Sequence, residues 1–191
     1  MKAAFAFPLV MLAASPAAAQ ELVQLPLFSD TLVLQGEFGV TSSTLQPDTA
    51  EVSFWRPVTL YDDDEPVGGR MDCRLAGVVQ PYTDELFDIA ARYEASKTRR
   101  DYAGLDDDGD PDYSEDGLVR RLQVTGRSND PHHHYVLTFL AIHAGEALYD
   151  IRINCEFRHL HSPDNDTDYA AIQARYVDLA IPVPAASQEG Q

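Results

Sequence analysis

Apolar and polar residues alternate along two segments with the two-residue period of a strand that buries one face. The first segment is Arg70–Gln80 and the second is Leu148–Arg158. The apolar face of the first consists of Met71, Cys73, Leu75 and Val79, and that of the second consists of Tyr149, Ile151, Ile153, Cys155 and Phe157. We therefore expect two half-buried strands, each of which points its cysteine into the core.

The segment between these strands predicts a meander. Tyr135–Ile142 is apolar on both faces, as expected of a central strand that is covered on both sides. The dipeptide Ala-Gly at 144–145 indicates a tight hairpin to the strand that follows. Leu118–Thr125 alternates as well, and the sequence SNDP at 128–131 is a strong turn signal. Together these features predict three consecutive antiparallel strands.

Two further strands are expected nearer the N-terminus. Val52–Leu60 has strand character, but Pro57 inside it has no N–H to donate to a ladder. This proline places the strand at a sheet edge or at a bulge. Residues 31–40 are a weaker candidate.

Two segments carry helix signals. Thr83 can cap a helix with Asp84 and Glu85 in its first turn and basic residues in its last turn, which suits the helix dipole at both ends. Its expected buried stripe is Leu86, Ile89, Ala90 and Tyr93. A second helix is expected to start near Thr167 or Asp168. Its expected apolar face is Tyr169, Ile172, Tyr176 and Leu179.

This order of elements predicts an α+β fold, because strands and helices do not alternate regularly. We expect one antiparallel sheet of about five to six strands, including the C-terminal meander, packed by two helices. From Leu118 to Ala180, the order loosely resembles the PsbP/Mog1-type fold, in which a final antiparallel hairpin leads into a C-terminal helix packed on the sheet. The resemblance rests on element order and implies no function.

The N-terminus predicts export. Residues 1–19 have the layout of a secretory signal peptide, with Lys2 at the start, a short apolar run, and small residues at 17–19 for cleavage. We expect a single domain over residues 20–181, a flexible tail at 182–191, and no membrane insertion after cleavage. A periplasmic or secreted address makes Cys73 and Cys155, the two cysteines of the chain, a predicted disulfide.

The charge of the chain excludes some partners. The 191 residues carry a formal net charge of −17, and loss of Lys2 with the signal peptide would make it −18. Nucleic acid and anionic membrane surfaces would repel such a protein, so we expect neither as a partner. The chain contains no G-x-S-x-G, H-E-x-x-H or S-x-x-K motif for hydrolysis. The sequence therefore favours a protein without catalytic activity.

One acidic segment is a candidate calcium site. Asp101–Asp116 contains eight acidic residues and no basic residue. Carboxylates alternate around Gly109, a spacing that lets a loop direct several oxygens at one Ca²⁺. The candidate ligands are Asp106, Asp108, Asp110 and Glu115. The match to an EF-hand is partial, because Gly104 falls at the first ligand position and Pro111 lies inside the loop. The alternative, which we favour, is a mobile loop with its carboxylates in water.

A second candidate metal site involves histidines. If the hairpin turns at 144–145, the numbers of paired residues sum to 289 or 290, and the second register places His134 opposite Glu156. A trio of His132, His134 and Glu156 could then hold zinc or copper. Arg158 beside the trio is unfavourable to a cation. We therefore favour polar histidines at a hairpin end over a metal site.

The sequence thus predicts a periplasmic or secreted binding or accessory domain that is not catalytic. Its ligand would be a protein or a small molecule that the sequence does not identify. The alternative is a metal-binding exported protein, with calcium at 106–115 or a transition metal at the histidines. No resident cofactor is expected unless it is calcium.

The first testable prediction concerns export. Cleavage is expected after Ala19, because small residues precede this bond, so the mature chain should begin at Gln20. Mass spectrometry of the exported protein checks this prediction. An intact Met1 on the exported chain would contradict it.

Overall fold

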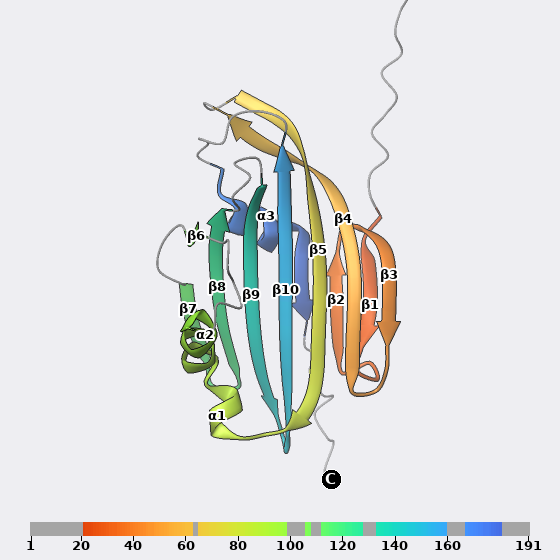
Figure 1. Cartoon of the computed structure of the whole chain (residues 1–191). Coiled ribbons are helices and arrows are strands. Elements are labelled where there is room, and N and C mark those ends of the chain that lie inside the picture. The colour runs from red at the N-terminus through yellow and green to blue at the C-terminus, as the bar shows by residue number, and fades with distance from the viewer. Residues whose placement is uncertain are drawn as a thin grey trace, which may run out of the picture.

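The computed structural model describes residues 21–62, 65–98, 106–107, 112–127, 133–159 and 167–180 (Figure 1). The predicted signal peptide and the predicted flexible tail at 182–191 lie outside these ranges. The described strands are β1 (Val23–Leu27), β2 (Leu32–Gly36), β3 (Gly39–Leu45), β4 (Thr49–Asp62), β5 (Glu65–Pro81), β6 (Asp106–Asp107), β7 (Asp112–Asp116), β8 (Val119–Arg127), β9 (His133–Ala144), β10 (Ala147–His159) and β11 (Val177–Ala180). The described helices are α1 (Asp84–Phe87), α2 (Ile89–Thr98) and α3 (Tyr169–Tyr176).

The described strands form two antiparallel sheets. The larger sheet has the order β3-β4-β5-β10-β9-β8-β6, and β7 also pairs with β8. The smaller sheet has the order β1-β2-β11. The α+β class is as predicted, but two sheets of eight and three described strands replace the one sheet of five to six. The missed strands lie in the N-terminal and acidic segments and at 177–180.

The central pairing of the larger sheet joins β5 to β10. Cys73 lies directly opposite Cys155 in this register. Their Cα atoms are 4.0 Å apart, and the two sulfur atoms form a disulfide. The predicted bridge is therefore confirmed. Both cysteines are buried on the same face of the sheet, as the alternation of β5 and β10 predicted.

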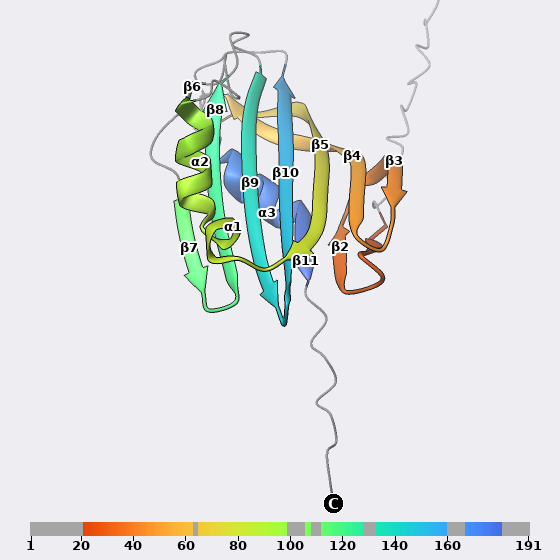
Figure 2. The ribbon, with the colours of Figure 1, turned by 60° about the horizontal axis from the view of Figure 1, so that its bottom comes forward.

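That face of the larger sheet, called here the covered face, packs against the smaller sheet and α3 (Figures 1 and 2). Its core includes Phe54, Leu75, Ile151 and Phe157, which are nearly inaccessible to solvent. The core also holds a polar network beneath α3. Gln123 donates from Nε2 to Gln173 Oε1 at 2.9 Å, and the Thr138 hydroxyl donates to the same oxygen at 2.7 Å. These hydrogen bonds offset the cost of burying the three polar side chains.

The opposite face is covered only in part. Helices α1 and α2 pack over β8 and β9, where Phe87, Ile89 and Tyr93 meet an apolar cluster that includes Leu122 and Leu137. On β4, β5 and β10 the same face carries mainly exposed or half-buried residues, as the uncovered strands in Figure 2 show. We call this uncovered part the open face. It is the larger sheet's accessible surface beside α2.

The helix predictions hold at their N-termini. The Thr83 side chain accepts a hydrogen bond from the N–H of Leu86, and the Asp168 side chain accepts one from the N–H of Ala171. The first predicted helix is interrupted at Asp88, whose carboxylate caps the next turn by accepting from the N–H of Ala91. The predicted second helix was too long: Leu179 lies in strand β11, opposite Leu34. Pairing with β2 satisfies the backbone there in place of helical hydrogen bonds.

Pro57 lies where the sequence predicted, at an edge. Among the described strands, β3 pairs with β4 only as far as Trp55, so the remainder of β4 is paired on one side, with β5. On the side of β4 that has no neighbouring described strand, the missing N–H of the proline therefore removes no hydrogen bond from the sheet.

The second testable prediction concerns the disulfide. The bridge joins positions 82 residues apart, and in the chain-entropy model such a link stabilises a domain by about 4 kcal/mol. Replacing both cysteines with alanine should lower the free energy of unfolding by several kcal/mol, as measured by urea titration. Thiol titration of the unfolded, unreduced wild type should find no free thiol. Two free thiols would contradict the prediction.

Candidate functional site

A pocket of about 400 Å³ lies between α2 and the open face. It has the size of a small-molecule site. Most of its accessible lining is apolar. The lining residues are Ala76, Gly77 and Val78 of β5, Ile89, Arg92 and Tyr93 of α2, Phe139 of β9, and Asp150 and Arg152 of β10.

The strand register builds the floor of this pocket. Arg152 lies between Ala76 on β5 and Phe139 on β9, in one row across three strands. Asp150 lies two residues earlier on β10, and it therefore shares the face of Arg152. The Arg152 guanidinium carbon is 5.4 Å from the centre of the Phe139 ring, a cation–π distance. One cationic group thus lies directly beside an apolar, aromatic floor.

Helix α2 forms the wall of the pocket. The Tyr93 ring packs against Phe139, with ring centres 5.8 Å apart. Arg92 forms an ion pair with Asp150 across the gap between helix and sheet, and it also donates to the carbonyl oxygen of Leu86 at 2.8 Å. The ion pair ties α2 to β10 at one end of the pocket. The wall is therefore held in place by contacts to the floor itself.

A polar groove of about 250 Å³ lies further along the open face. Its lining includes Asp72 and Glu156, which are directly opposite each other on β5 and β10. Like charges in this position destabilise a sheet unless they are compensated. Arg70 binds Asp72 through two nitrogens at 2.6 and 2.9 Å, and Arg158 binds Glu156 through two nitrogens at 2.8 and 3.0 Å. Each carboxylate therefore has a guanidinium partner.

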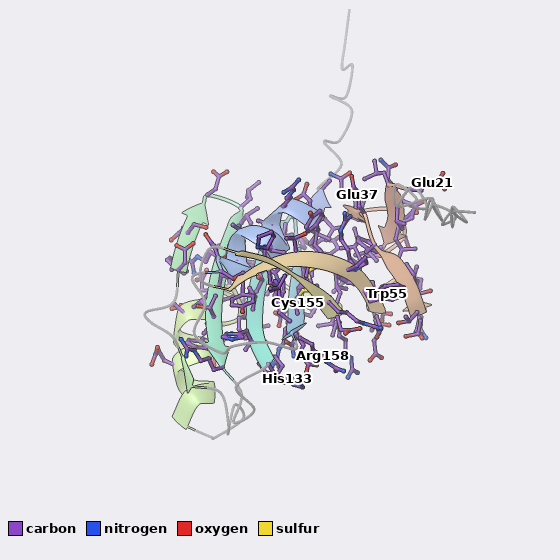
Figure 3. All side chains as sticks on the ribbon, turned by 90° about the horizontal axis from the view of Figure 1, so that it is seen from above. Glu21, Glu37, Trp55, His133, Cys155 and Arg158 are labelled. Carbon is purple, nitrogen blue, oxygen red and sulfur yellow. A yellow bond between two sulfur atoms is a disulfide. The ribbon has the colours of Figure 1, made fainter. Side chains whose placement is uncertain are left out.

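Two further contacts complete this charged cluster. His133 lies with Nδ1 2.7 Å from Glu156, and the Arg70 guanidinium carbon lies 4.7 Å from the centre of the Trp55 ring. Figure 3 shows His133 and Arg158 beside each other, on the side of the sheet away from α3. The hydrogen bond to Glu156 raises the pKa of Arg158 above its ordinary value.

The expected register of the histidine hairpin was wrong by one residue. Paired numbers sum to 291, so His134 lies opposite Phe157, and Glu156 lies opposite Tyr135. The cause is the turn, which has Gly145 at a φ of +65° as its first central residue and therefore lies one position later than expected. His134 and Glu156 are consequently on opposite faces of the sheet.

The structure gives His134 a different environment. Its side chain is only 3% exposed, and its ring stacks on Tyr169 of α3, with ring centres 4.4 Å apart. His132 lies outside the described residues. Both oxygens of Glu156 are occupied by Arg158 and His133. The candidate trio of His132, His134 and Glu156 is therefore not assembled around one point, and no group of three potential metal ligands occurs among the described side chains.

The acidic segment is partly a strand. Residues 106–107 and 112–116 pair with β8 as β6 and β7, so these residues form strands where the sequence predicted a loop. Glu115 accepts a hydrogen bond from Arg120 at 3.1 Å, which supplies the basic partner that its own segment lacks. Asp108 and Asp110 lie outside the described residues.

The two described calcium candidates are far apart. Asp106 lies opposite Arg127 on β8, whereas Glu115 lies opposite Arg120. Seven positions of strand, at about 3.3 Å each, separate the two sites by roughly 23 Å. The oxygens that bind one Ca²⁺ each lie about 2.5 Å from the ion. Asp106 and Glu115 therefore do not share a calcium ion in this arrangement.

Comparison of the chain with protein-family models, with curated proteins and with solved structures found no match. The resemblance to the PsbP/Mog1-type fold therefore remains an expectation from element order. Among the helices described, none is long and apolar enough to span a bilayer.

Sequence reasoning missed the pocket beside α2. It did assign Ile89 and Tyr93 to the buried stripe of a helix, and it placed Arg152 on the polar face of its strand. Prediction of the pocket would have required both assignments and, in addition, the packing of α2 beside β10. The charge alternation in 148–158, with Asp150 followed by Arg152, was the available signal.

The third testable prediction concerns calcium. Because Asp106 and Glu115 are separated along β8, Asp108→Ala should leave the melting temperature and the protease sensitivity of 101–116 unchanged, with or without millimolar calcium. Limited proteolysis and thermal denaturation of the wild type and the variant check this. Calcium protection that is present in the wild type and absent in the variant would contradict it.

Proposed function

We propose that this protein is a non-catalytic binding domain of the periplasm or the extracellular space, and that it binds a small molecule in the pocket between α2 and the open face. The observation that carries the proposal is the pocket itself. It combines an apolar, aromatic lining with a few polar groups at one end, which is the usual composition of a ligand site.

Three features support a binding role over a catalytic one. The acid of the pocket, Asp150, is bound by Arg92, so it is not poised as a general base. The pocket lining contains no serine, cysteine or histidine that could act as a nucleophile with its base. The two cysteines of the chain form the disulfide on the other face.

The extracytoplasmic address is supported by the disulfide and by the predicted signal peptide. Disulfides persist mainly in oxidising compartments. The two signals are independent, because the bridge depends on strand register and the signal peptide depends on the N-terminal sequence. An exported, acidic, disulfide-bonded domain with a pocket is typical of a protein that captures a ligand outside the cytoplasm.

The fourth testable prediction examines the pocket with N-phenyl-1-naphthylamine, a neutral apolar dye that fluoresces when bound. Ala76 is exposed on the pocket floor, so Ala76→Phe fills the space without disturbing the core. Loss of about 60 Å² of buried dye surface costs about 1.5 kcal/mol, or about tenfold in affinity. Fluorescence titration of the wild type and the variant measures this loss.

Thr59→Phe is the matched control for this experiment. Thr59 is an exposed residue of β4 outside the pocket lining, and it receives the same new side chain. The control should bind the dye as the wild type does. Equal affinities for all three proteins, or no saturable binding to any of them, would refute the pocket as a ligand site.

A further inference from the structure

A second pocket, of about 150 Å³, lies on the covered face, between α3 and β11 on one side and β8, β9 and β10 on the other. We call it the α3 pocket. Figure 2 shows α3 behind these three strands, on the side of the sheet away from α2. The polar side chains of its lining are Arg121, Thr138, Gln173 and Asp178.

The alternation of β8 directs Arg121 to the covered face. Leu122 packs with the apolar cluster of α1 and α2, so its neighbours Arg121 and Gln123 lie on the other face. The hydrogen bond from Gln123 to Gln173 of α3 identifies that side as the covered face. Arg121 is half-buried there. A cationic side chain is therefore held between the sheet and α3.

Arg121 lacks the carboxylate partner that several other arginines have. Among the described residues, none forms an ion pair or a hydrogen bond with its guanidinium, and its Nε is buried. Arg120 also has a buried Nε without a partner, but its terminal nitrogen binds Glu115. An N–H that is buried without an acceptor is costly, and an anion in the pocket would supply the acceptor.

The acid of the lining does not neutralise Arg121 by direct contact. Asp178 is an exposed residue of β11, and its carboxylate accepts a hydrogen bond from Gln35 of β2 at 3.0 Å. Solvent and salt screen an exposed charge much more strongly than a buried one. Inside the pocket, the half-buried guanidinium of Arg121 therefore has the larger effect on a ligand.

The rest of the lining limits the size and the polarity of a ligand. Its apolar members include Leu140, Ile153, Val177 and Leu179. An apolar cavity of about 150 Å³ can hold benzene, which has six carbon atoms. A ligand of similar size, with one anionic end and one hydrocarbon end, would match the cation and the apolar side chains together.

We propose that the α3 pocket binds a short-chain monocarboxylate. Its carboxylate meets the guanidinium of Arg121, and its hydrocarbon end lies against Leu140 and Ile153. A planar guanidinium matches the two oxygens of a carboxylate in a bidentate geometry. The inference goes beyond the proposed function and does not depend on it, because the two pockets lie on opposite faces of the larger sheet.

The test compares butyrate with butyramide, a neutral molecule of the same length. Sodium chloride added to the butyramide samples keeps the ionic strength equal. Butyrate should raise the melting temperature of the wild type more than butyramide does, because a ligand that binds the native state stabilises it. Calorimetric titration should find butyrate bound at least about tenfold more tightly, because its hydrogen bonds to Arg121 are charge-assisted. Equal effects of the two molecules would overturn the inference, and this comparison requires no variant.

Arg121→Met tests the role of the charge. It should not lower the melting temperature of the ligand-free protein, because it replaces a cation without a partner by an apolar side chain of similar length. In this variant butyrate and butyramide should have equal effects. A preference for butyrate as large as that of the wild type would overturn the role of Arg121.

Ala174→Phe tests the position of the site, with Ala171→Phe as its matched control. Both alanines are exposed residues of α3, but Ala174 lines the α3 pocket and Ala171 does not. Ala174→Phe should abolish the response to butyrate, and Ala171→Phe should retain it. Loss of the response in both variants, or in neither, would overturn the assignment of the ligand to this pocket.

One further variant separates this inference from the proposed function. Ala76→Phe fills the pocket beside α2, so it should leave the response to butyrate unchanged. If Ala76→Phe abolishes that response, butyrate binds beside α2. The inference about the α3 pocket is then overturned, while the proposed function stands.

Discussion

The register between β5 and β10 is the constraint on which the rest of the structure depends. Side chains alternate between the two faces of a strand, so a shift of one residue would exchange the faces completely. In the observed register Cys73 lies opposite Cys155, and the disulfide fixes that alignment covalently. The same register places the apolar residues of both strands toward the smaller sheet and α3. Burial and the covalent bond therefore specify one alignment.

The register that determines the residues of the covered face also determines which residues lie on the open face. Asp72 and Glu156 must lie opposite each other once the cysteines beside them are paired, and two arginines compensate the repulsion. Arg152 is placed by the same alignment in a row with Ala76 and Phe139. The pocket then requires one more condition, that α2 covers β8 and β9 and stops short of β5. The core that includes the disulfide and the proposed binding pocket thus lie on opposite faces of one sheet.

The sequence predicted those features that depend on local alternation and capping. The faces of β5 and β10, the caps at Thr83 and Asp168, and the disulfide are of this kind. It did not predict features that depend on pairing between distant segments. Leu179 was assigned to a helix because its pairing with Leu34 of β2 cannot be derived from a helical period. The pocket was not predicted for the same reason, because its lining residues come from β5, α2, β9 and β10.

Acidic residues at the edge of a sheet can oppose association with other chains, and this effect requires no bound cation. At one edge of the larger sheet, β7 exposes a run of residues that includes Asp112, Glu115 and Asp116. Unpaired strand edges can join to other chains, and exposed charges at an edge oppose this association. The opposite edge, β3, carries no charged residue from Gly39 to Leu45, but its register shifts between Val40 and Ser42. Such an irregularity also disfavours pairing with another strand. The acidic residues of β7 therefore protect an edge, while Arg70 and Arg158 on the open face compensate the carboxylates around the groove.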